Sequence, residues 1–144
     1  MLDGIVALAK EVIVLPSGDC PYEIERSSKL YPFFKNAIGA IDGTHIEALV
    51  PTADVPCYHN RKGQITLNVI VACTFSMYFC FVLSGWEGSA HDRRVYKDAL
   101  TKRFIVPKAK YYLGDAGYPL SDKCLTPYRG VRYHLREQYQ TRNK

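Results

Sequence analysis

Several signatures of common protein classes are missing from this 144-residue chain. It has no Gly-rich phosphate loop, no dinucleotide-binding fingerprint and no motif for a nucleophilic Ser or Cys. No run approaches the roughly 18 apolar residues that a membrane helix requires. In the N-terminal stretch MLDGIVALAKEVIVL, Lys10 and Glu11 interrupt the apolar run that a signal peptide requires. We therefore expect neither a signal peptide nor membrane association.

The cysteines form no CxxC pair, the spacing typical of zinc sites and redox motifs. They are Cys20, Cys57, Cys73, Cys80 and Cys124. Cys73 and Cys80 lie inside strongly apolar runs, where a reduced cysteine packs as a small core residue. We expect a reducing compartment, without a disulfide framework or a structural zinc site.

The composition is that of a globular protein, with 47% apolar and 23% charged residues. A chain of this length forms one domain that buries roughly 70% of its unfolded surface. The net charge of +5 favours an anionic partner. The basic residues are dispersed, apart from a C-terminal concentration of Arg129, Arg132, Arg136, Arg142 and Lys144. A solvated basic surface explains this concentration as well as a binding surface does.

Apolar spacing predicts one helix followed by three strands. Residues 2–13 have the spacing of a short amphipathic helix. Strand patterns follow at 38–50, 65–75 and 78–86. The last two are apolar on both alternating faces, so we expect central strands that are covered on both sides. Because only two residues separate them, these strands are predicted to form an antiparallel hairpin.

A second helix and a fourth strand complete the predicted pattern. Apolar residues recur at helical spacing from Asp92 to Phe104, and Asp92 is placed to cap the start of this helix. The strand pattern returns at 111–114, and a strand after a helical crossover is most simply parallel to an earlier strand. The order of elements therefore predicts an α/β domain with a mixed sheet.

Two aspartates stand where a sheet would favour apolar residues. If the strands at 38–50 and 111–114 lie side by side and parallel, Asp42 and Asp115 converge near one end of the sheet. Two neighbouring carboxylates stay ionised near neutral pH when a cation lies between them, and Mg²⁺ suits such a site because it prefers carboxylate oxygens and retains water. The alternative is that each aspartate only ends a strand or caps a turn.

Five blocks of the sequence resemble the nuclease domain of PIF/Harbinger-type transposases, which are DDE superfamily endonucleases. The blocks are GAIDGTHIEALVP, YHNRKGQITLNVIVAC, GWEGSAHDRRVYKDAL, KYYLGDAGYPL and PYRGVRYHL. The resemblance implies an RNase H-like mixed sheet flanked by helices, with three acidic residues that hold two divalent cations, Mg²⁺ or Mn²⁺. It makes Asp42 and Asp115 the first and second catalytic acids and metal ligands, and Asp92 a further candidate ligand.

The third acid of this family is a glutamate on a helix several tens of residues beyond the second aspartate. This chain ends at Lys144, 29 residues after Asp115, and Glu137 belongs to the YHLRE block instead. The resemblance therefore predicts a fold that is incomplete at its C-terminus. Residues 1–29 are predicted to form an N-terminal helix and connection, and residues 30–144 a partial nuclease domain.

The resemblance makes DNA the expected partner and the nucleus the expected location, with a DNA-binding partner protein as a further candidate. Arg61, Lys62, Arg129 and Arg132 are the candidate phosphate contacts. Arg61 and Lys62 lie in a loop that resembles the family's RNRKG block, and an exposed connection explains this loop equally well. Trp86 is interpreted as packing at the edge of the core rather than as stacking on a base.

The activity implied by the resemblance is metal-dependent cleavage of DNA phosphodiester bonds, impaired here by the missing third acid. The alternative is a non-catalytic DNA- or protein-binding remnant of a domesticated transposase. A metal-dependent hydrolase of small substrates is disfavoured, because the resemblance to a DNA-processing enzyme runs through most of the chain.

Overall fold

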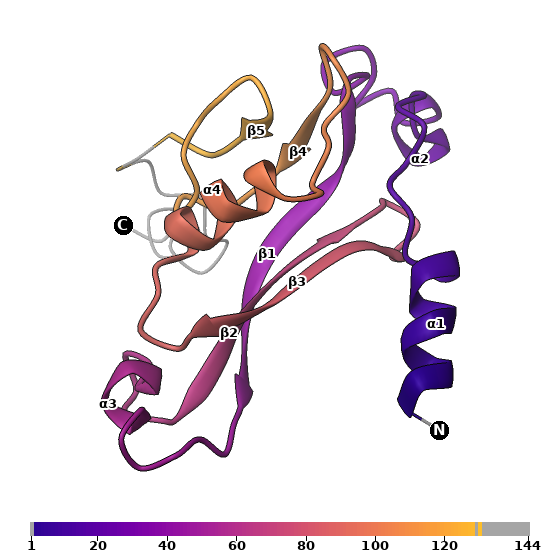
Figure 1. The fold of residues 1–144 in the computed structure, drawn as a ribbon. Helices are drawn as coiled ribbons and strands as arrows, with labels where there is room; N and C mark the ends of the chain where they lie inside the picture. Colours follow the sequence, from indigo (N-terminus) through magenta and orange to yellow (C-terminus); the bar gives the residue numbers. More distant parts are fainter. Residues whose placement is uncertain (1, 129, 131–144) are drawn as a thin grey trace, which may run out of the picture.

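The centre of the structure, a computed structural model that describes residues 2–128 and 130, is a five-stranded sheet in the order β3-β2-β1-β4-β5 (Figure 1). The strands are β1 (Ala37–Glu47), β2 (Thr66–Cys73), β3 (Phe79–Glu87), β4 (Tyr111–Leu113) and β5 (Cys124–Leu125). β2 runs antiparallel to both β1 and β3, whereas β4 is parallel to both β1 and β5. The predicted mixed sheet is confirmed, and its strand order is consistent with an RNase H-like fold.

Four helices lie within the described residues. They are α1 (Leu2–Val12), α2 (Tyr22–Glu25), α3 (Val55–Tyr58) and α4 (Asp92–Thr101). Helix α4 lies across one face of the sheet, whereas α1 stands at the periphery and buries none of its residues (Figure 1). Both predicted helices are confirmed. In the described part of the chain, no helix is long and apolar enough to cross a membrane.

A tight turn joins β2 to β3. The Thr74 N–H donates to the Tyr78 carbonyl at 2.9 Å, and the Met77 N–H donates to the Thr74 carbonyl at 3.0 Å. Met77 has φ 67°, a left-handed conformation that reverses the chain within few residues. Val71 then pairs with Val82 across the two strands. The predicted antiparallel hairpin is thereby confirmed.

Strand β3 forms an edge of the described sheet, so the prediction that it is a central strand covered on both sides is wrong. Phe79 and Val82 of β3 are 58% and 41% exposed. β2 does occupy the predicted inner position, and its residues Val69 and Ile70 are buried. Apolar residues on both faces do not distinguish an inner strand from an edge strand, because the pattern does not report how many neighbours a strand has.

The hydrophobic core lies between α4 and the sheet. The buried residues of α4 are Val95, Tyr96 and Ala99. The Phe104 ring lies 4.9 Å from the Tyr112 ring, and the Tyr118 ring meets the Tyr96 ring edge-on at 5.7 Å between centroids. Burying each of these aromatic side chains contributes about 1.5–3 kcal/mol. This packing fixes β4 and the segment that follows it against α4.

Candidate functional site

Strands β1 and β4 bring two aspartates to the same end of the sheet. Ala40 of β1 pairs in parallel with Leu113, the last residue of β4. Two residues further along each segment stand Asp42 and Asp115. The predicted parallel pairing of these two strands is confirmed. The role of the two aspartates as metal ligands stays a prediction.

Both aspartates are exposed, and each accepts a hydrogen bond from a nearby backbone N–H. The Gly43 N–H donates to Asp42 Oδ1 at 2.8 Å, and the Gly117 N–H donates to Asp115 Oδ1 at 2.8 Å. Such local bonds are those of the turn-forming alternative. They engage one oxygen of each carboxylate, and no described residue donates a hydrogen bond to the other oxygen. Turn formation therefore leaves an oxygen free for a ligand.

Asp92 approaches Gly43 of β1 from the start of α4. Its Oδ1 accepts a hydrogen bond from Asn68 Nδ2 at 3.0 Å. A Cβ atom at Gly43 would lie 2.7 Å from this oxygen, so Asp92 fits against β1 only because residue 43 has no side chain. The predicted capping role of Asp92 is wrong: the N-cap residue is His91, and the Asp92 carboxylate is bonded to Asn68 instead.

Tyr118, which the sequence analysis does not identify, is close to all three aspartates. Burial raises the pKa of its hydroxyl, and the negative charges of Asp92, Asp42 and Asp115 raise it further. A Cβ atom at Gly43 would lie 3.4 Å from this hydroxyl. The charges of all three carboxylates, here called the acidic group, therefore act on one buried side chain. The sequence signal that was available is the position of the tyrosine in the same short turn as Asp115.

The donor chemistry of the acidic group fits a hard divalent cation, which binds carboxylate oxygens and retains several waters. Gly43 lets the Asp92 carboxylate approach β1 closely, and the Tyr118 hydroxyl is buried without a hydrogen-bond partner among the described residues. However, no three His, Cys, Asp or Glu side chains of the described chain lie close enough together to hold a metal ion. A cation here would be held by part of the acidic group and by water.

A cleft of about 370 Å³, here called the basic cleft, opens beside Asp92. Its polar lining includes His45, Asn60, Arg61, Lys62, His91 and Asp92. Arg61 Nη2 lies 3.0 Å from His91 Nδ1, a distance at which the guanidinium donates to a neutral imidazole. Asn60 Oδ1 accepts from the Lys62 N–H at 2.9 Å and so shapes the turn. Arg61 and Lys62 are exposed here, where phosphate contact stays a prediction.

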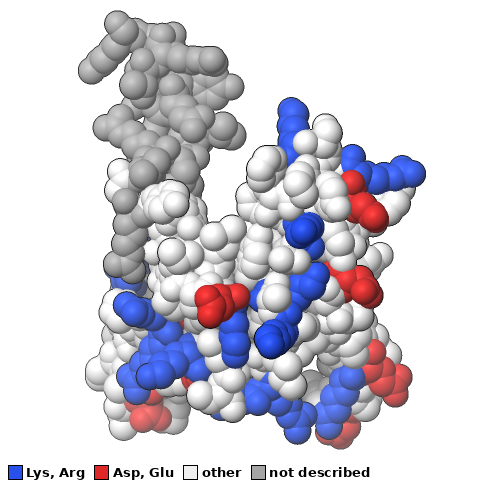
Figure 2. Space-filling view, turned by 90° about the horizontal axis from the view of Figure 1, so that it is seen from above, with Lys and Arg blue, Asp and Glu red and all other residues white. Residues whose placement is uncertain are grey.

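The remaining predicted basic contacts lie outside the described residues. These are Arg129 and Arg132, together with Arg136, and Glu137 also lies there. Figure 2 shows one face of the molecule, on which the Lys and Arg side chains form several separate groups with acidic side chains between them. Charge on this face is therefore mixed rather than gathered into a single basic block.

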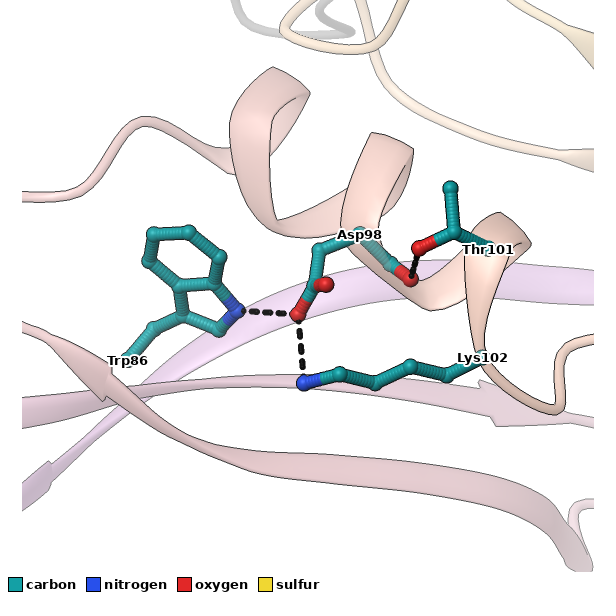
Figure 3. Close-up of polar contacts among 4 residues, drawn as sticks. All are labelled: Trp86, Asp98, Thr101 and Lys102. Atoms are coloured by element: carbon teal, nitrogen blue, oxygen red, sulfur yellow. Dashed lines mark hydrogen bonds and ion pairs between the residues drawn. The ribbon is translucent and has the colours of Figure 1, made fainter.

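Trp86 packs at the edge of the core, as the sequence predicts. Its indole Nε1–H donates to Asp98 Oδ2 at 2.8 Å, and Lys102 Nζ lies 2.8 Å from the same oxygen (Figure 3). These bonds, first that of Lys102 and then that of Trp86, hold the pKa of Asp98 below its ordinary value. The Arg94 guanidinium lies 5.0 Å from the centre of the indole ring. Trp86 therefore joins β3 to α4.

Comparison with protein families gives a match to a stretch of the chain that contains all three residues of the acidic group. The sequence profile described as "DDE superfamily endonuclease" matches residues 41–144. This range begins one residue before Asp42 and includes Asp92 and Asp115. The match covers more than half of the chain and includes the basic cleft.

Curated relatives are similar to this chain over part of their length. The rat protein named "Putative nuclease HARBI1" is 36% identical over 93 residues, which are 62% of this chain and 27% of the relative. The Arabidopsis thaliana protein named "Protein ALP1-like" is 33% identical over 116 residues, 66% of this chain and 28% of the relative. The chain therefore spans just over a quarter of the length of these relatives. No solved structure gives a significant match.

Proposed function

The chain belongs to the DDE superfamily endonucleases, and from that premise we propose that it is a metal-dependent DNA endonuclease domain of a Harbinger-type, transposase-derived protein. Its substrate is the phosphodiester backbone of DNA, its cofactor Mg²⁺ or Mn²⁺, and its location the nucleus. The observation that carries this proposal is the parallel pairing of β1 with β4, in which Asp42 and Asp115 each follow by two residues the paired Ala40 and Leu113.

Each aspartate has a distinct part in the proposed site. Asp42 and Asp115 hold the cation through the oxygens that their turns leave free. Asp92 is a further ligand, and the Asn68 amide orients it. A bound divalent cation supplies Lewis-acid activation of water and stabilises the charge that develops on the leaving oxygen. In this proposal the aspartate side chains bind the cation and hold their carboxylate oxygens towards it.

DNA is held through its phosphates in this proposal. Arg61 and Lys62 project from the wall of the basic cleft, and Asp92 lines the same cleft. A phosphate bound by Arg61 and Lys62 therefore lies next to the acidic group. Arg129 and Arg132 are the other proposed phosphate contacts. Contacts of this kind position the nucleic acid without reading its sequence, so a DNA-binding partner protein is proposed to supply target selection.

We propose further that cleavage by the 144-residue polypeptide is impaired. The family to which the chain belongs uses three acids, and among the described residues no three metal-binding side chains come together. Each additional divalent ion needs more carboxylate charge to offset its own. The three aspartates therefore hold one ion more readily than the two that assist the attacking and leaving oxygens in a two-metal site.

A non-catalytic DNA- or protein-binding role is the alternative. The same lack of a three-residue metal cluster favours it, together with the net charge of +5. If this alternative holds, substitution of the acidic group leaves DNA binding unchanged, and the chain shows no specific binding of divalent cations. Metal binding therefore separates the two functions.

Calorimetric titration of the whole chain with Mn²⁺ tests the proposal. Asp42→Asn removes one of the two principal ligands, and we expect it to abolish measurable binding. Because Asp42 is exposed, the fold is expected to survive, and circular dichroism checks this. Supercoiled DNA incubated with the unmodified polypeptide and Mg²⁺ is expected to show no nicking above background.

Asp54→Asn is the matched control, because Asp54 is also exposed and its side chain makes no helix-capping bond. This variant is expected to bind Mn²⁺ as the unmodified chain does. Equal binding by the unmodified chain and by Asp42→Asn would refute the proposed metal site. Strong Mg²⁺-dependent nicking that disappears in Asp115→Ala would instead refute the proposed impairment.

A further inference from the structure

Two tyrosine hydroxyls are buried without a hydrogen-bond partner among the described residues, those of Tyr118 and Tyr96. Their side chains are 2% and 1% exposed, and the two rings are in edge-on contact. A buried polar group that makes no hydrogen bond destabilises a protein, since it has lost its water and gained nothing in return. Such a group in a native structure calls for a partner that the described residues do not supply.

The surroundings of the two hydroxyls differ. Besides burial, the charges of Asp92, Asp42 and Asp115, followed by Cys124, raise the pKa of Tyr118. Burial and then Cys124 raise the pKa of Tyr96 to about 12, the Ser121 side chain lowers it, and no aspartate contributes. Tyr118 is therefore a neutral donor next to several acceptors, and it remains protonated at any physiological pH. Tyr96 occupies the same core without carboxylates around it.

The space in front of the Tyr118 hydroxyl is defined by Gly43. A Cβ atom there would lie 3.4 Å from the hydroxyl oxygen and 2.7 Å from Asp92 Oδ1. The hydroxyl and the carboxylate oxygen therefore both lie close to Gly43, and they approach β1 at this position because glycine has no side chain.

We propose that Tyr118 is a positioning residue, whose hydroxyl donates a hydrogen bond to the acidic group or to its bound water when a divalent cation is present. This inference rests on the proposed metal site. In this structure Asp92 Oδ1 is bonded to Asn68, and the Tyr118 hydroxyl has no hydrogen-bond partner among the described residues. With the cation, the carboxylates are drawn together, and the hydroxyl then fixes the orientation of one of them from the core side.

Tyr118→Phe tests this role, because it removes the hydroxyl and keeps the ring in its packing. We expect Mn²⁺ binding to weaken about fivefold, the effect of losing one ordinary hydrogen bond. In the absence of metal, the midpoint of thermal unfolding is expected to stay the same or rise, since an unsatisfied group has been removed. A tyrosine with a merely structural role would show the reverse: lower stability and unchanged metal affinity.

Tyr96→Phe is the matched control, because it removes an equally buried and unpartnered hydroxyl away from the aspartates. It is expected to leave Mn²⁺ affinity unchanged. Addition of Mg²⁺ is expected to alter the near-ultraviolet tyrosine absorption of the unmodified chain and of Tyr96→Phe, but not that of Tyr118→Phe. This spectral change reports on the hydroxyl directly and does not depend on activity.

The two levels of the inference fail in different ways. If the unmodified chain binds Mn²⁺ and Tyr118→Phe binds it equally well, the role of Tyr118 is overturned and the metal site stands. If the unmodified chain binds no Mn²⁺, both the metal site and the role of Tyr118 are overturned. A fivefold loss in both tyrosine variants would assign the effect to core packing and would also overturn the proposal.

Discussion

The two halves of β1 lie in very different surroundings. From Ala37 to Ile41 the strand is mostly buried, whereas from Asp42 to Glu47 it is mostly exposed. β2 pairs with the strand from Ala40 to Glu47, but β4 accompanies only its first residues, up to Ala40. The change therefore falls where β4 has ended. Because β4 ends here, Asp42 is open to solvent, while pairing with β2 still holds its backbone in place.

Truncation of an isoleucine is expected to lower stability far more in the buried half of β1 than in its exposed half. Ile41→Ala in the buried half creates a cavity in the core and is expected to lower the free energy of unfolding by about 2–5 kcal/mol. Ile46→Ala makes the same chemical change in the exposed half, where the side chain is 53% exposed, and is expected to cost less than about 1 kcal/mol. Urea unfolding of both variants measures the difference. Similar losses would show that the two halves are equally packed.

The two halves of β1 are also expected to differ in how they tolerate a side chain in place of glycine. A Cβ atom at Gly39 would lie 2.2 Å from the Cys73 backbone carbonyl, so Gly39→Ala must move the sheet and is expected to cost about 1–3 kcal/mol. At Gly43 the obstacle is the end of the Asp92 side chain, which can rotate away. Gly43→Ala is therefore expected to cost little stability and to weaken Mn²⁺ binding. Urea unfolding and calorimetry measure these two effects.

The opposite pattern would contradict that prediction. If Gly43→Ala unfolds as readily as Gly39→Ala, then Asp92 is held too rigidly to give way. If Gly43→Ala retains full Mn²⁺ affinity, then the position of Asp92 does not matter for the cation.

The smallest expected effect lies in the basic cleft, which adjoins the exposed half of β1 through His45. Arg61→Ala and Lys62→Ala each remove one proposed phosphate contact. Each is expected to weaken binding to duplex DNA at low salt and to reduce the slope of log K against log salt by about 1. Lys10→Ala, on the peripheral helix α1, is the control and is expected to change neither quantity. Unchanged slopes in the two cleft variants would remove this loop from the DNA-binding surface.

The sequence predicts the pairing of β1 with β4 because the rule behind it is general. A strand that follows a helical crossover most simply lies parallel to an earlier strand, and this rule predicts that Asp42 and Asp115 lie at the same end of the sheet. The edge position of β3 was not predictable in this way. Its apolar residues are those of an inner strand, and only the arrangement of all five strands decides which of them has one neighbour.

The position of Asp92 was predicted, but its contacts were not. The helical spacing placed Asp92 at the start of α4, whereas its bond to Asn68 links residues that only the packing of α4 on β2 brings together. Tyr118 was missed for a similar reason. The sequence places Tyr118 in the same short turn as Asp115, but it does not show that the side chain is buried, because this burial depends on the aromatic core formed by Tyr96 and its neighbours.

The exposed edge strand β3 has a practical consequence for solubility. An edge strand with unpaired backbone hydrogen-bonding groups can pair with a strand of another molecule, and the exposed Phe79 and Val82 add apolar surface that favours association. Against this, the pairing of β3 with β2 is irregular at two places, between Asn68 and Ile70 and between Ala72 and Cys73. Such irregularities twist an edge and make it a poor template for a straight strand. Self-association in concentrated samples is therefore expected to begin on the more regular stretch between them, around Val82.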